Sequence, residues 1–96
     1  SIALSINAED QAAVHFYRSA ELSFEAGDMN AAATRLEAAL GLLPGDRHSL
    51  VLQARVFIET GRQGEARVIL EELLVSDPDD AEVSALLQQV PAPGAP

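Results

Sequence analysis

The side chains of this chain that could take part in chemistry are two histidines, fifteen carboxylates and six arginines. We expect His15 and His48 near the same face of two successive helices, where Glu21 or Asp46 could join them around a metal ion. A metal site needs three or four converging ligands, and no H-x-x-x-H or E-x-x-H spacing occurs. We therefore interpret both histidines as surface or groove-lining residues and expect no metal site.

No other motif indicates catalysis. The sequence lacks a G-x-S-x-G motif and a phosphate-binding glycine loop, and the absence of cysteine removes a thiol nucleophile and any disulfide. The acidic stretch SDPDD at residues 76–80 lacks the glycine and the distal glutamate of a calcium-binding loop, so turn and cap chemistry explains it better. We predict no catalytic residue, no cofactor and no enzymatic activity.

Composition limits the classes of partner. The 96 residues suffice for one domain, and the formal net charge of −9 disfavours binding to nucleic acids and to anionic membrane surfaces. No apolar run approaches the ~20 residues needed to cross a bilayer, so we expect no membrane insertion. Arginine without lysine, together with abundant alanine, favours a bacterial source. Cytoplasmic and periplasmic locations both stay open.

Helix-breaking residues divide the chain into five predicted helices. Gly27 and Gly61 are expected to end the first and third helices in the left-handed conformation, and Pro44 and Pro78 to end the second and fourth. The predicted spans are 8–26, 30–43, 47–60, 65–76 and 81–90.

Short polar residues predict where helices begin. Asn7 and Asp46 are placed as N-caps of the first and third helices, while Asp79 and Glu82 form a capping box for the fifth. Before the first helix, residues 1–7 alternate apolar and small side chains, which is consistent either with an unstructured leader or with an arm that lies in an apolar groove. Residues 91–96 are predicted to form a Pro/Gly/Ala tail.

The two helix pairs are copies of one unit. Residues 13–46 and 47–80 overlay with nine identities, against the two or three that chance would give. The identical pairs are Ala20/Ala54, Glu25/Glu59, Gly27/Gly61, Ala32/Ala66, Leu36/Leu70, Glu37/Glu71, Leu40/Leu74, Pro44/Pro78 and Asp46/Asp80. They are turn residues, helix stops, and small or apolar residues where helices approach each other closely.

This unit of 34 residues resembles the tetratricopeptide repeat. The first repeat carries that family's pattern at Phe16, Ala20, Phe24, Gly27, Ala32, Ala39 and Pro44. The second carries it at Leu50, Ala54, Phe57, Gly61, Ala66 and Pro78. The resemblance covers residues 8–90 and implies an all-α superhelix of antiparallel helix pairs. It would comprise about two and a half repeats, with residues 81–90 as a capping helix.

The resemblance also implies a binding surface, because ligands of this family bind the concave face lined by the first helix of each repeat. By position, the groove would contain Val14, Tyr17, Arg18, Glu21, Phe24, His48, Val51, Leu52, Arg55 and Ile58. Val51, Leu52 and Ile58 are apolar residues beyond those that helix 47–60 needs for its own buried side. We therefore expect these three side chains to line the groove rather than to belong to the core.

One family subtype does not fit. Domains that clamp a carboxylate have Lys and Asn on the first groove helix, where this chain has Tyr17 and Glu21. We predict a non-catalytic module that binds a peptide or an amphipathic helix in its groove, as a scaffold or adaptor. The alternatives are a homo-oligomerisation module, and a secretion or assembly chaperone for an aggregation-prone subunit.

Overall fold

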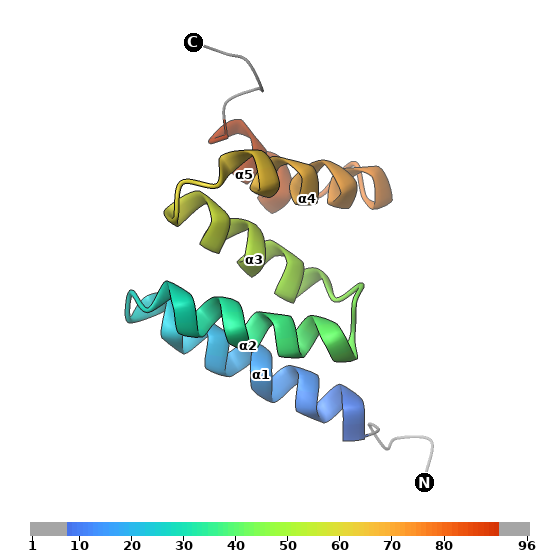
Figure 1. The fold of residues 1–96 in the computed structure, drawn as a ribbon. Coiled ribbons are helices and arrows are strands. Elements are labelled where there is room, and N and C mark those ends of the chain that lie inside the picture. The colour runs from blue at the N-terminus through green and yellow to red at the C-terminus, as the bar shows by residue number, and fades with distance from the viewer. Residues whose placement is uncertain (1–7, 91–96) are drawn as a thin grey trace, which may run out of the picture. The chain divides into compact units, whose positions relative to one another are not determined.

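The computed structural model describes residues 8–90, and every regular element in this range is an α-helix (Figure 1). The helices are α1 (Ala8–Glu25), α2 (Met29–Leu42), α3 (Arg47–Glu59), α4 (Gln63–Ser76) and α5 (Ala81–Gln88). The prediction of an all-α fold built from five helices is confirmed. The predicted N-terminal arm, its cap Asn7 and the C-terminal tail lie outside the described residues.

Two glycines end α1 and α3 with the same geometry. Gly27 has a φ of 84° and Gly61 a φ of 81°, a left-handed conformation that glycine adopts without a Cβ clash. Each turn is closed by the same two backbone hydrogen bonds. The amide of Gly27 donates to the carbonyl of Phe24, and that of Asp28 to the carbonyl of Ser23. In the second turn, 34 residues later, the amide of Gly61 donates to the carbonyl of Ile58 and that of Arg62 to the carbonyl of Phe57. Both predicted helix stops are therefore confirmed.

Aspartates cap three of the helices. Asp28 Oδ1 accepts from the amide of Ala31 at 3.0 Å, and Asp46 Oδ2 accepts from the amide of Ser49 at 3.3 Å. Asp46 is therefore the N-cap predicted for α3.

At α5 the sequence prediction is wrong by one residue. Asp80, not Asp79, is the N-cap, and its Oδ1 accepts from the amide of Val83 at 3.2 Å. The amide of Asp79 instead donates to Oδ1 of Asp77 within the preceding turn. The predicted capping box of Asp79 with Glu82 is not formed, because the helix begins one residue later than that box requires.

The chain divides into two compact units between Ser49 and Leu50. The first unit contains α1 and α2, which pack side by side as an antiparallel hairpin (Figure 1). Its buried apolar residues are mostly small, which lets the two backbones approach closely; they are Ala13, Ala20, Ala32, Leu36 and Ala39.

A polar bridge also joins the two helices of the first unit. The guanidinium of Arg35 donates to Ser23 Oγ at 3.0 Å, and that hydroxyl donates to the carbonyl of Ser19. Ser19 and Ser23 stand where the repeat pattern usually has larger apolar residues.

The second unit has its core between α3, α4 and α5. The buried members of this core are Val51, Ala54, Ala66, Leu70, Val83 and Val90. Leu86 and Leu87 of α5 pack against them, so the last helix turns an apolar face toward this core. At the end of α5, the guanidinium of Arg67 donates to the carbonyl of Val90 at 3.3 Å.

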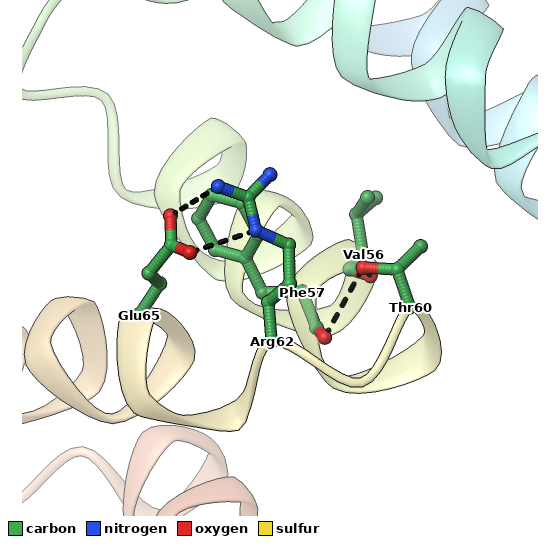
Figure 2. A network of polar contacts seen from close by, with 5 residues as sticks. All are labelled: Val56, Phe57, Thr60, Arg62 and Glu65. Atoms are coloured by element: carbon green, nitrogen blue, oxygen red, sulfur yellow. Dashed lines mark hydrogen bonds and ion pairs between the residues drawn. The ribbon is translucent and has the colours of Figure 1, made fainter.

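The turn between α3 and α4 is held by a side-chain network around Arg62 (Figure 2). The guanidinium lies over the ring of Phe57, 5.0 Å from its centroid, and forms two hydrogen bonds to Glu65, from Nε to Oε1 at 2.7 Å and from Nη2 to Oε2 at 2.9 Å. Arg62 occupies the N-cap position of α4 but makes no side-chain cap bond. The Arg62–Glu65 pair joins the N-cap position of α4 to the residue three positions later. The hydrogen bond between Asp28 and Ala31 joins the same two positions in α2.

Candidate functional site

A concavity of about 330 Å³ lies in the first unit, between α1 and the start of α3. It is lined by Val14, Tyr17, Arg18, Glu21, Asp46 and His48. The first four come from α1, where spacings of three and four residues place them on one face of the helix. Asp46 and His48 flank the first residue of α3, so the cap that starts this helix also brings them to the site.

Two aromatic rings and two carboxylates set the chemistry of this concavity. The rings of Tyr17 and His48 lie with centroids 6.0 Å apart and planes inclined at 48°, so they do not stack face to face. The hydroxyl of Tyr17 donates to Glu21 Oε2 at 3.3 Å. Asp46 accepts from the hydroxyl of Ser49 at 2.6 Å through Oδ2. The lining thus contributes two carboxylates and one guanidinium, that of Arg18.

Five of the ten predicted groove residues therefore line one concavity; they are Val14, Tyr17, Arg18, Glu21 and His48. Phe24 is half-buried further along α1 and does not line it. Arg55 is exposed on the part of α3 that belongs to the second unit. The groove as a binding surface stays a prediction.

The remaining predicted groove residues lie in or against cores. Val51 and Leu52 are only 5% and 2% exposed, and Val51 is a member of the core of the second unit. Ile58 packs against that same core. The expectation that these three side chains are surplus to the core is therefore wrong. The physical reason for Val51 is that it shares its core with Val83 and Val90, and the periodicity of α3 alone does not predict that these distant residues join it.

Sequence reasoning did not include two members of this surface. Asp46 was assigned to a cap and considered only as a metal ligand, yet it also lines the concavity. Leu22, which is 68% exposed, lies eight residues after Val14 and four after Arg18, on the same side of α1. The helical spacing was the signal that could have identified Leu22. Below, "the α1 face" means Val14, Tyr17, Arg18, Glu21 and Leu22.

The described residues hold no cluster for metal chemistry. Within residues 8–90, no three His, Cys, Asp or Glu side chains lie together in a way that could hold a metal ion. His15 is exposed on α1 and does not line the concavity, so the expected proximity of the two histidines to a shared partner is not seen. None of the described helices is long and apolar enough to span a membrane.

A comparison with known families agrees with the helical fold. A family model of the tetratricopeptide repeat matches residues 23–90, more than two thirds of the chain. No curated protein and no solved structure gives a significant match. The chain belongs to the tetratricopeptide-repeat family. Repeats of this family generally mediate protein–protein interactions, and its members are typically non-enzymatic scaffolds.

Proposed function

We propose that this chain is a non-catalytic interaction module that binds a peptide or amphipathic helix of a partner protein on the α1 face. The observation that carries the proposal is the exposure of large apolar side chains beside the concavity. Val14 is 47% exposed and lines the concavity with Tyr17 and Glu21, and Leu22, one helical turn after Arg18, is 68% exposed. A row of exposed apolar side chains at helical spacing, bordered by charges, suits a partner segment with a matching apolar stripe.

The chain offers a matched control for this surface. Val68 and Val75 are 56% and 82% exposed on α4 and belong to the second unit. The variant Val14→Ser/Leu22→Ser and the variant Val68→Ser/Val75→Ser each remove two exposed apolar side chains, but from different surfaces. Circular dichroism checks that both variants stay helical.

The test uses peptides selected on the purified chain from a random library displayed on phage. We expect selected peptides to bind the native chain and the α4 variant with similar affinity, and the α1 variant at least tenfold more weakly. Such a loss corresponds to about 1.4 kcal/mol, a reasonable value for two apolar contacts. Equal loss in both variants, or loss only in the α4 variant, would contradict the proposal.

Self-association is a second candidate, and the exposure of Phe16 favours it. This aromatic side chain is 40% exposed on α1, although the repeat pattern places a packed residue there. A second copy could cover it. Sedimentation equilibrium distinguishes the two candidates, because a dimer would dissociate on dilution and would be weakened by Phe16→Gln. A monomer at all concentrations leaves partner binding as the function.

A further inference from the structure

We infer that Arg18, at the centre of the α1 face, pairs with an acidic side chain that lies inside the apolar stripe of the partner segment. This inference rests on the proposed function and names the charge that the partner carries at that point. Arg18 is exposed and lies four residues after Val14 and four before Leu22. The three residues therefore follow one ridge of the helix, with the arginine midway between two exposed apolar residues about 12 Å apart along the axis.

Arg18 differs from the other arginines because it has no partner within the described part of the molecule. Five of the six arginines interact with neighbouring groups; they are Arg35, Arg47, Arg55, Arg62 and Arg67. Within residues 8–90, no hydrogen bond, ion pair or ring contact joins the guanidinium of Arg18 to another group. The positions four residues before and after it, where a helix could supply a carboxylate, hold Val14 and Leu22.

The two carboxylates that line the concavity with Arg18 are engaged by other groups. Glu21 Oε2 accepts from the hydroxyl of Tyr17 at 3.3 Å. Asp46 Oδ2 accepts from the amide and the hydroxyl of Ser49 at 3.3 and 2.6 Å. The guanidinium of Arg18 is therefore available to a ligand.

Docking of a partner on the α1 face makes this cation a condition on the partner. A segment that contacts both Val14 and Leu22 passes over Arg18 and removes water from its guanidinium. Taking a charge out of water is unfavourable unless an opposite charge and hydrogen-bond acceptors replace that water. A carboxylate supplies both, since it can accept two parallel hydrogen bonds from one guanidinium. A partner with an apolar or basic residue at this point is disfavoured, which gives the face its selectivity.

The long-range field limits what the rest of the segment can carry. The formal net charge of −9 repels a segment that is acidic as a whole. Glu25 is exposed and lies three residues after Leu22, so it borders the same ridge. The segment that fits is therefore basic along its border and has a single acidic residue between its two apolar contacts.

The test begins with a phage library of helix-forming peptides. Two leucines are fixed eight residues apart, matching the spacing of Val14 and Leu22, and every other position varies. Selection on the native chain should enrich Asp or Glu midway between the leucines at least about threefold over the unselected library. Selection on Arg18→Glu, which keeps a good helix former, should enrich Lys or Arg at that position instead.

A double-mutant cycle then measures the pair directly. The probe is a selected peptide made with an amidated C-terminus, so that no terminal carboxylate contributes, together with the same peptide in which the central acid is replaced by its amide. This replacement should weaken binding to the native chain at least about fivefold, and binding to Arg18→Gln less than about twofold. Arg62→Gln is the matched control: it changes the net charge equally, its side chain is 58% exposed, and it lies in the second unit. It should keep the fivefold difference, and circular dichroism checks that both variants stay helical.

Three outcomes would overturn the inference. They are a central position without enrichment of acidic residues, an equal loss on the native chain and on Arg18→Gln, and disappearance of the difference in Arg62→Gln as well. Failure here is distinct from failure of the proposed function. Peptides without a central acid that still depend on Val14 and Leu22 would retain the interaction module and exclude the Arg18 pair. An acidic peptide that couples to Arg18 but tolerates Val14→Ser/Leu22→Ser would do the reverse.

Discussion

Asp46 connects the local start of a helix to the proposed binding site. Its Oδ2 accepts from both the amide and the hydroxyl of Ser49, at 3.3 and 2.6 Å, and Ser49 is fully buried. The same aspartate lines the concavity with His48. The residue that caps α3 is therefore also a member of the proposed binding site.

The first prediction concerns this cap. Asp46→Ala should lower the free energy of unfolding by about 1–2 kcal/mol, because the amide and the buried hydroxyl of Ser49 lose their acceptor. Urea unfolding followed by circular dichroism measures this change. Asp46→Asn is the matched control, since it keeps an acceptor and removes only the charge, and it should cost less than half as much. Equal destabilisation by the two substitutions would show that charge, rather than the cap bond, stabilises the start of α3.

The residues of α3 show what sequence periodicity cannot resolve. Ala54 was correctly expected to be buried because small residues mark close helix crossings, and this depends only on the pairing of adjacent helices. The burial of Val51 depends on Val83 and Val90, more than thirty residues away in the chain. An apolar stripe along one helix predicts a single buried side of that helix. A helix inside a stack of repeats is covered by its neighbours on more than one side. The site prediction therefore gave the α1 residues that line the concavity and misplaced Val51 and Leu52.

At the scale of elements, the turns were the most predictable feature because their chemistry is local. Glycine in the left-handed conformation, a proline after a helix and an aspartate before one each act within a few residues. The start of α5 shows the limit of this reasoning. Asp77, Asp79 and Asp80 are all competent caps, and only the position at which the helix begins selects among them.

The second prediction tests the turn between α3 and α4 with two glycines of different geometry. Gly61→Ala should destabilise the chain by about 1 kcal/mol, because its φ of 81° disfavours any residue with a Cβ. Gly64→Ala should instead stabilise it by about 0.5 kcal/mol, since Gly64 lies within α4 and a Cβ there meets no atom within 4 Å. Thermal or urea unfolding of the two variants gives the signs. If both substitutions changed the free energy of unfolding in the same direction, the left-handed turn would not be what ends α3.

At the scale of the whole molecule, the internal repeat places equivalent core residues in different units. Leu36 of α2 and Leu70 of α4 are 34 positions apart, and both are completely buried. Repeat proteins are stabilised by the intrinsic stability of each unit and by interfaces between neighbours, so a local change need not spread over the whole chain.

The third prediction follows from this division. Leu36→Ala and Leu70→Ala should each cost about 2–5 kcal/mol in the unit that contains the cavity. In native-state hydrogen exchange, we expect Leu36→Ala to speed exchange mainly in α1 and α2, and Leu70→Ala mainly in α3, α4 and α5. Uniform acceleration along residues 8–90 in both variants would show instead that the two units unfold as one cooperative body.

The fourth prediction concerns the electrostatic field produced by the net charge of the whole chain. With a net charge of −9, attraction of a basic partner should operate before contact and should decline as salt shortens the Debye length, from about 10 Å at 0.1 M to about 3 Å at 1 M. Stopped-flow measurement with a selected arginine-containing peptide should therefore show an association rate that falls severalfold over this range. The dissociation rate should change less, because it depends mainly on short-range contacts at the α1 face.

A matched peptide with citrulline in place of each arginine separates this field from the apolar contacts. Its association rate should vary little with salt, while its dependence on Val14 and Leu22 should persist. If the arginine peptide also associated at a rate independent of salt, the net charge would have no part in recognition. The acidic surface would then contribute to the solubility of the chain, and selectivity would depend on the shape and apolar contacts of the α1 face alone.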